Sequence, residues 1–249
     1  MLDLFTLCVS AAAFIAALID TSLGMCYGTI LAPILLIAGY PPGVTVPTIL
    51  FSQLIVDIAG GLTHVKVKNF TKKDVKTALL VAIPATVLVP LGVFLNISLP
   101  VIVTKTYVGL LVTTLGLLLL LGISFKKRSS SGLLLISGIA GFNKGFIGGG
   151  FGPVVVSGQV VFNYNDRSSV SIGDIAEIPV CIVGLLAFAL QGKLTFLPIY
   201  LAVTIPALIA ALIGPHITLA FSRKGLLRSI IGVTTLLLGI TTLMKIILG

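Results

Sequence analysis

Charged residues are scarce in this chain of 249 residues. Asp, Glu, Lys and Arg together make up 9% of it, whereas a soluble globular domain contains about 25%. Hydrophobic residues make up 57%, and the mean hydropathy is +1.21. So little charge excludes a water-soluble surface, and the apolar runs 101–123, 194–221 and 226–248 are long enough to cross a bilayer. The composition therefore predicts an all-α integral membrane protein with about eight to ten membrane segments.

Cysteines are few, and the motifs of several enzyme classes are missing. Cys8, Cys26 and Cys181 lie far apart in apolar segments and have no metal-ligand or disulfide spacing. The sequence contains no His-Glu-x-x-His, Gly-x-Ser-x-Gly or Walker motif. We therefore expect no enzyme activity, metal centre, cofactor or ATP-driven pump. The N-terminus lacks a basic region, so we expect the first segment to be retained rather than cleaved as a signal peptide.

Acidic residues are outnumbered by basic ones, which gives a net charge of +9. A basic balance can indicate a nucleic-acid partner, but here Lys and Arg lie in short loops between apolar segments, where they set orientation. We therefore expect a lipid bilayer and no nucleic acid as partner. The positive-inside rule predicts a cell-membrane protein with both termini external. The basic residues of the expected cytoplasmic side are Lys66, Lys68, Lys72, Lys73, Lys76, Lys126, Lys127, Arg128, Arg167, Arg223, Lys224 and Arg228.

The chain contains an internal repeat. A shift of 124 residues places Gly24 on Gly148 and Gly28 on Gly152. Matching glycines and prolines continue in the same order along both halves, at nearly the same offset. We therefore predict two transmembrane repeats, residues 1–128 and 129–249.

Each predicted repeat has a first apolar segment, a glycine motif, a short apolar segment and three longer segments. An odd number of crossings per repeat inverts the second repeat relative to the first. Inverted repeats with glycine-broken short segments are typical of secondary transporters. Whether the first two segments of each repeat cross or turn back stays open. The expected segments are 4–22, 29–39, 44–65, 73–95 and 100–124, then 133–146, 153–164, 168–190, 194–221 and 226–248.

The glycine motifs, at 23–28 and 147–152, predict a binding site. A broken helix at membrane depth needs a protein-lined or wet interior, and the N-termini of the short helices would attract an anion. The alternative is that the glycines only permit close helix packing. The expected substrate-binding residues are Gly24, Cys26, Tyr27, Gly28, Gly148, Gly149, Gly150, Phe151, Gly152, Gln53 and Lys144.

Two opposite charges lie at matching positions within apolar segments. Asp20 aligns with Lys144, four residues before each glycine motif. A charge within the membrane is costly unless it is paired or functional. We expect either a structural ion pair between the two repeats or a role for Lys144 as countercharge to the substrate.

Three further carboxylates lie within apolar segments. Asp174 and Glu177 are three residues apart and share a helix face, and two buried carboxylates so close favour proton binding. We expect them to couple transport to protons, with hydrogen bonding to Ser and Thr as the alternative. Gln53 aligns with Glu177, and Asp57, which aligns with Cys181, is expected to be structural.

The motifs resemble a known family. Residues 24–28, followed by Pro33 and the turn at 39–42, resemble the first half of the TauE/SafE sulfite exporter family. Residues 148–153, followed by 173–177, resemble its second half. The resemblance covers essentially the whole chain. It implies an inner-membrane carrier with two inverted halves that moves sulfur-containing anions.

Two positions depart from the family pattern. Met25 and Cys26 stand where members often carry further glycines, and residues 165–167 replace the Pro-Pro-Gly of the first half. The first departure weakens the symmetry of an oxyanion site.

We therefore expect a secondary transporter for a small sulfur-containing anion, such as sulfite, thiosulfate, sulfoacetate or a related organosulfonate. It would work by alternating access with proton coupling. A passive channel and a carrier of a cation or neutral solute that uses the buried carboxylates stay open as alternatives. The direction of transport, the coupling ion and the oligomeric state stay open as well.

Overall fold

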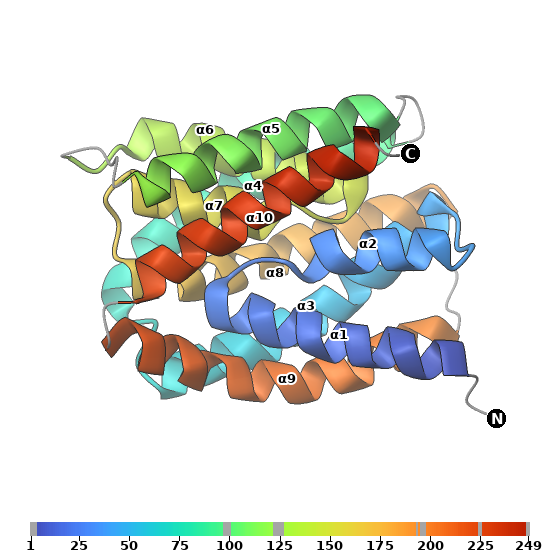
Figure 1. Cartoon of the computed structure of the whole chain (residues 1–249), viewed down its shortest axis with the longest axis horizontal. Helices are drawn as coiled ribbons and strands as arrows, with labels where there is room; N and C mark the ends of the chain where they lie inside the picture. Colours follow the sequence, from blue (N-terminus) through green and yellow to red (C-terminus); the bar gives the residue numbers. More distant parts are fainter. Residues whose placement is uncertain are drawn as a thin grey trace.

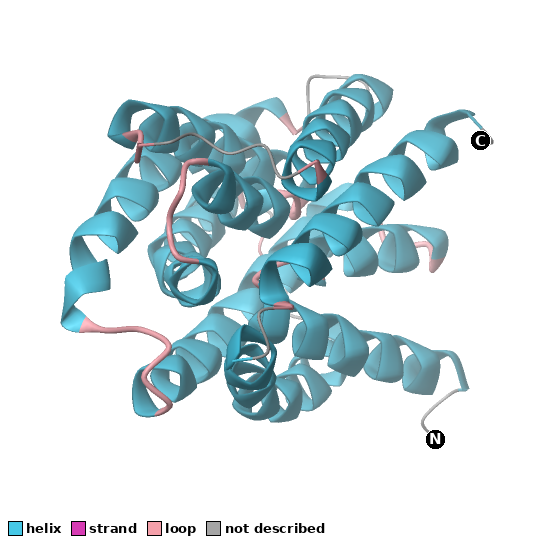
Figure 2. Ribbon diagram, turned by 60° about the vertical axis from the view of Figure 1, so that its left-hand side comes forward, coloured by secondary structure: helices cyan, strands magenta, loops and turns pink. Residues whose placement is uncertain are grey.

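The computed structural model describes residues 4–96, 101–121, 127–192, 194, 198–223 and 226–247. These residues form helices joined by short loops and contain no strand (Figure 2). The all-α fold is thereby confirmed. The helices are α1 (Leu4–Leu23), α2 (Tyr27–Ile37), α3 (Pro42–Lys66), the 3₁₀ turn η1 (Lys72–Asp74), α4 (Val75–Leu95), α5 (Val101–Leu120), α6 (Ser130–Ile147), α7 (Phe151–Val161), α8 (Asp166–Leu190), α9 (Pro198–Arg223) and α10 (Leu227–Ile247).

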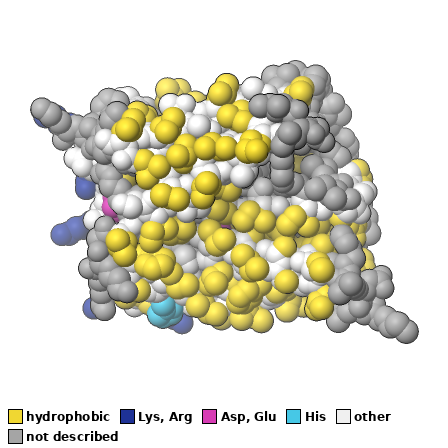
Figure 3. All heavy atoms as spheres, viewed as in Figure 1, with side chains coloured by type: hydrophobic (Ala, Val, Ile, Leu, Met, Phe, Trp, Pro, Cys, Tyr) yellow, Lys and Arg dark blue, Asp and Glu magenta, His cyan; other side chains and the backbone are white. Residues whose placement is uncertain are grey.

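The surface is that of a protein surrounded by lipid. Among the described residues, five helical stretches are long and apolar enough to cross a membrane, in α1, α3, η1 with α4, α8 and α9. Apolar side chains cover the flank of the molecule, and the visible Lys and Arg side chains gather at one end (Figure 3). The chain is therefore an integral membrane protein, as its composition predicts.

Each predicted apolar segment corresponds to one helix. The short helices start slightly earlier than expected, at Tyr27 and Phe151, so the aromatic residue of each glycine motif opens a helix. Where η1 begins, the backbone N–H of Thr71 donates to Asp74 Oδ2 at 2.8 Å, which closes the loop before α4.

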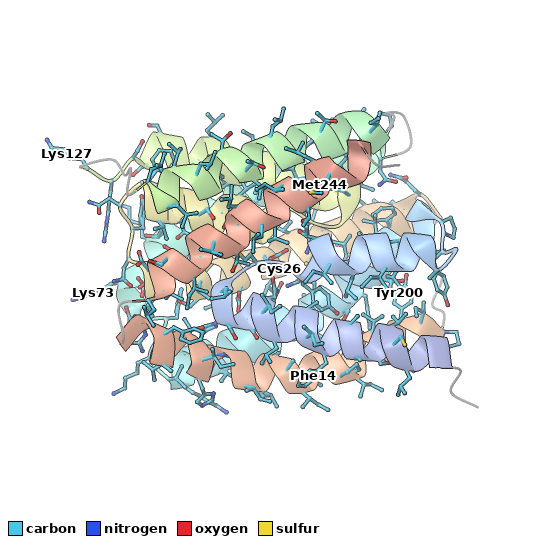
Figure 4. All side chains as sticks on the ribbon, viewed as in Figure 1. Phe14, Cys26, Lys73, Lys127, Tyr200 and Met244 are labelled. Atoms are coloured by element: carbon cyan, nitrogen blue, oxygen red, sulfur yellow. The ribbon has the colours of Figure 1, made fainter. Side chains whose placement is uncertain are left out.

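The path of the chain decides how the first two helices of each half run. Both termini lie at one end of the molecule (Figure 1). From that end α1 runs inward, and α2 returns toward it. α6 and α7 form the same kind of pair at the opposite end, where Lys73 and Lys127 lie (Figure 4). The first two helices of each half therefore turn back within the molecule, and the second half runs opposite to the first.

The two halves exchange a helix. α9, from the second half, packs along α1 and shares a buried core with α1, α2 and α3. α4, from the first half, packs along α6 and shares a core with α6, α7 and α8. We call these two groups the α9 bundle and the α4 bundle. Residues 1–128 and 129–249 are thus intertwined, which the repeat pattern did not reveal.

Several contacts across the halves are reciprocal. Gly116 of α5 packs against the backbone of Leu236, and Gly239 of α10 packs against that of Thr113. A shift of 123 residues carries one pair onto the other, because it takes Gly116 to Gly239 and Thr113 to Leu236. The buried Asp57 and Cys181, related by 124 residues, face each other, with Sγ 4.0 Å from Oδ2. Such reciprocity is typical of a two-fold arrangement, and it supports the two predicted repeats, although their boundary stays a prediction.

The contact between α4 and α6 has a measurable consequence. A Cβ at Gly141 would overlap the backbone of Ala85, whereas one at Gly43 would meet nothing within 4 Å. We expect Gly141→Ala to destabilise the protein by about 1–3 kcal/mol and Gly43→Ala to be nearly neutral. The temperature at which the buried Cys26 and Cys181 react with a thiol dye measures unfolding. Equal unfolding temperatures for the two variants would contradict this packing.

Candidate functional site

The two glycine motifs cross at the middle of the molecule, where Cys26 lies (Figure 4). A Cβ at Gly28 would overlap the carbonyl oxygen of Gly148, and one at Gly152 would overlap that of Gly24. These two contacts are again reciprocal. A shift of 124 residues takes Gly24 to Gly148 and Gly28 to Gly152, and so carries one contact onto the other. The glycines thus do allow close packing, and the packing brings the starts of α2 and α7 together.

The turns before α2 and α7 share one backbone conformation. Gly24 and Gly148 have φ values of 74° and 72°, and Cys26 and Gly150 have values of 106° and 79°. Cys26 therefore holds a left-handed backbone that favours glycine. Strained backbone of this kind is concentrated at functional sites in proteins. The departure from the family motif at Cys26 leaves the turn itself symmetric.

A small, partly open cavity lies at this crossing, and the space between its lining atoms, about 190 Å³, includes space open to the outside. Its walls come from both motifs and from four charged or polar side chains on α1, α3, α6 and α8. It gathers most of the predicted substrate-binding residues and Glu177, whereas Gly24, Gly148, Asp57 and Asp174 are not among its lining residues. The lining residues are Asp20, Cys26, Tyr27, Gly28, Thr29, Gln53, Lys144, Gly149, Gly150, Phe151, Gly152, Pro153 and Glu177.

One wall of the cavity is acidic. Gln53 Nε2 donates to Asp20 Oδ2 and to Asp57 Oδ1, both at 2.7 Å. This arrangement leaves Gln53 Oε1 buried, with no hydrogen-bond partner among the described atoms. Tyr27 also lines the cavity, and its hydroxyl forms a hydrogen bond with the hydroxyl of Ser52.

The opposite wall holds an ion pair. Lys144 Nζ lies 2.5 Å from Glu177 Oε1, and both side chains are almost fully buried. The predicted ion pair between Asp20 and Lys144 is therefore wrong. Each of these two residues binds within its own half, Asp20 to Gln53 and Lys144 to Glu177. The two contacts are equivalent by position, so the symmetric fold carries an amide–carboxylate pair on one side and an ion pair on the other.

Asp174 and Glu177 do not pair with each other either. Asp174 Oδ2 lies 3.2 Å from Nε2 of the buried His64, while Glu177 is held by Lys144. The two carboxylates share α8, as predicted, but each has a different partner. The proton-coupling roles of Asp174 and Glu177 stay predictions.

Sequence reasoning missed three polar residues near the site: His64, Asn69 and Arg167. Asn69 Nδ2 lies 2.8 Å from His64 Nδ1, and Arg167 Nε donates to Asn69 Oδ1 at 2.5 Å. They come from the end of α3, the following loop and the start of α8. No spacing in the sequence links them, because only the tertiary fold brings α3 beside α8.

A second group forms beside the ion pair. Ligand atoms of Asp57, Glu177 and Cys181 lie within 4.8 Å of one another, and all three residues are buried. The sequence suggested no metal spacing, since these residues come from two helices 120 positions apart. The Lys144 ammonium, which is paired with Glu177, disfavours a cation at this cluster by electrostatic repulsion.

Comparison with known proteins decides the family. The model of the family described as "Sulfite exporter TauE/SafE" matches residues 9–242. The chain belongs to the TauE/SafE family. It is also similar to the probable membrane transporter protein YtnM of Bacillus subtilis (strain 168), at 30% identity over 150 residues, or 56% of this chain and 49% of YtnM. The chain thus aligns with about half the length of that relative.

Proteins of the TauE/SafE family, to which this chain belongs, are membrane transporters rather than enzymes. A transporter acts on a small solute from within lipid. The polar cavity at the glycine crossing is the candidate solute site.

The Lys144–Glu177 pair can be tested by stability. Removing one member of a buried ion pair leaves an uncompensated charge and costs about 3–5 kcal/mol. We therefore expect Lys144→Gln alone to lower the unfolding temperature strongly. The double variant K144Q/E177Q should recover most of the loss. Lys76→Gln, at an exposed lysine, is the control, and a double variant no more stable than K144Q would mean that the pair is not formed.

Proposed function

We propose that this TauE/SafE protein is a secondary transporter that moves a small sulfur-containing anion, such as sulfite, thiosulfate, sulfoacetate or a related organosulfonate. The observation that carries the proposal is the cavity at the glycine crossing, which combines a buried lysine with the N-termini of two helices. An ammonium group and helix N-termini both stabilise oxyanions.

The backbone supplies the donors for an oxyanion. The first turn of a helix has N–H groups without intrahelical partners. Gly28 and Thr29 of α2 and Phe151 and Gly152 of α7 line the cavity in such turns. The buried acceptor Gln53 Oε1 would suit a hydroxyl on an oxyanion that keeps one proton, or a bound water.

The charges around the cavity support proton coupling. Asp20, Asp57, Asp174 and Glu177 are buried near Lys144, the one lysine that is buried in the described part of the chain, and Lys144 is already paired. In this proposal an anion that binds Lys144 displaces the Glu177 carboxylate. A displaced, buried carboxylate is costly unless it takes up a proton. Anion and proton would therefore bind together, the anion at Lys144 and the proton at Glu177.

The exchange of helices between the halves suggests which parts would move. In alternating access two rigid bodies rock about a central site. Here the natural bodies are the α9 bundle and the α4 bundle, because each has its own buried core. The cavity lies where the glycine motifs of these bundles cross.

We also propose a cell-membrane location with the basic end in the cytoplasm and both termini outside. Lys66, Lys68, Lys72, Lys73 and Lys76 are exposed at or near the α3–α4 connection. That connection lies at the end opposite the termini (Figures 1 and 4). Positive charge of this kind is typical of cytoplasmic loops.

A cation carrier is the second candidate. The cluster of Asp57, Glu177 and Cys181 favours it, since three ligand atoms so close could surround one ion. The short Lys144–Glu177 contact opposes it, because a cation would have to displace the ammonium.

Counterflow in proteoliposomes tests the function. Vesicles are loaded with sulfite, thiosulfate, sulfoacetate, taurine or sulfate, with and without a pH gradient. Accelerated exchange of one sulfur anion that responds to pH supports the proposal. Flux without counterflow or saturation would indicate a channel. Folded protein that exchanges none of these solutes would contradict the proposed substrate class, and exchange of a cation would favour the second candidate.

Glu177→Gln separates binding from coupling. Glutamine keeps the shape of Glu177 but leaves the Lys144 charge available to an anion at every pH. We expect the half-saturating anion concentration, which should fall with decreasing pH in the parent protein, to become low and independent of pH in the variant. The measurement is saturable exchange between pH 5 and 8. A variant with the parent's pH dependence of half-saturation would remove Glu177 from the mechanism.

A further inference from the structure

A second buried polar chain connects the neighbourhood of the cavity to the basic end of the molecule. It runs from Arg167, at the start of α8, through Asn69 and His64 to Asp174. His64, Asn69 and Asp174 are each at most 3% exposed. The proposed anion site at Lys144 uses none of these residues. Buried polar chains of this kind are costly unless they have a structural or functional role.

The hydrogen bonds of this chain determine the protonation of His64. Arg167 Nε donates to Asn69 Oδ1, and because a guanidinium has no acceptor, the amide oxygen must face it. The Asn69 amide nitrogen then faces His64 Nδ1 and also donates to the Pro215 carbonyl oxygen, both at 2.8 Å. His64 Nδ1 must therefore accept a hydrogen bond. These contacts fit a ring that carries its proton on Nε2.

The other side of the ring faces acceptors. His64 Nε2 lies 3.1 Å from the carbonyl oxygen of Thr21 and 3.2 Å from Asp174 Oδ2. A second proton can only bind at Nδ1, where the N–H of Asn69 already points. Turning the Asn69 amide around would set its N–H against that of Arg167 and remove the donor from Pro215. The imidazolium form of His64 is therefore incompatible with the Asn69–Arg167 contact.

We infer that His64 and Asp174 form a second proton-binding site, separate from Lys144 and Glu177, whose occupation opens the Asn69–Arg167 contact at the basic end. The proton comes from water and binds Nδ1, and the resulting imidazolium pairs with the Asp174 carboxylate. When His64 releases the proton, Asn69 can return and the contact can close. The inference rests on the proposed proton-coupled carrier.

The contact is well placed to control access. Arg167 also donates from its second terminal nitrogen to the carbonyl oxygen of Val67 at 2.9 Å. It therefore ties the loop after α3, which continues the α9 bundle, to the start of α8 in the α4 bundle. Opening it would remove one of the polar contacts between the two bundles at the basic end, where Ser171 Oγ also donates to the Asn69 carbonyl oxygen at 3.1 Å.

Few other charges can act on His64. The helices around it are α1, α8 and α9, and α9 reaches it through the carbonyl of Pro215 on Asn69. The titratable groups next to it on these helices and on α3 bind other partners or are exposed. Asp20 and Asp57 bind Gln53, Glu177 binds Lys144, and Lys66 and His216 are exposed.

His64→Gln tests the inference in proteoliposomes, with His216→Gln as the matched control at an exposed histidine. Glutamine can accept from Asn69 and donate to Thr21, but it cannot take up a proton. In the parent and in H216Q we expect the maximal exchange rate to change severalfold between about pH 5 and 8. In H64Q the maximal rate should be flat, while the half-saturating concentration keeps the pH dependence assigned to Glu177. A maximal rate in H64Q that follows the parent's profile would overturn the inference.

A labelling experiment decides the inference without any substrate. Ser168 lies beside Arg167, and a cysteine there reports opening of the contact. It is introduced into a Cys8→Ser background, because Cys8 is exposed whereas Cys26 and Cys181 are buried. Relative to a free thiol at the same pH, reaction with an impermeant maleimide should rise severalfold on acidification, and Arg167→Gln should raise it at every pH. Unchanged reactivity from pH 8 to 5 would overturn the inference, whether or not sulfur anions are transported.

Discussion

The backbone contact between the two glycine turns is the constraint on which the rest of the structure depends. Gly28 touches the carbonyl of Gly148, and Gly152 touches that of Gly24, so no side chain fits at either crossing. The contact places the starts of α2 and α7 against each other inside the membrane. Backbone N–H groups left there need a polar or wet surrounding. The buried charged side chains around the glycine crossing provide this polar surrounding, and together with the two glycine motifs they line the cavity.

The fold is nearly symmetric, but its chemistry is not. Positions 20 and 53 make the same contact as positions 144 and 177, yet one pair is Asp with Gln and the other is Lys with Glu. A symmetric scaffold thus offers an acidic wall and a wall with the only buried lysine among the described residues. In the proposed function, this asymmetry leaves Lys144 as the binding group for the anion. The Glu177 carboxylate, displaced from Lys144, would then take up a proton. The strained backbone of Cys26 shows the same principle, since the turn is kept although the glycine is not.

The exchanged helices α4 and α9 decide which helices share a buried core. Each joins three helices of the other half, so the two packed bundles differ from the two sequence repeats. Polar contacts such as Arg167 with Asn69 and Val67 then join the two bundles at one end of the molecule. Contacts of this kind can change with protonation, whereas the apolar cores cannot.

Composition, hydropathy and the repeat of glycines determined the membrane class, the ten helical segments and the opposite directions of the two halves, because these follow from local and periodic patterns. The same patterns singled out the glycine motifs and the buried charges. Only the tertiary structure decided which charges meet. Asp20 and Lys144 align in sequence but bind different residues, and Asp174 pairs with His64 rather than with Glu177. Partners on different helices depend on how α1, α3, α6 and α8 rotate and cross, and those angles are set by side-chain packing along whole helices, which no short stretch of sequence contains.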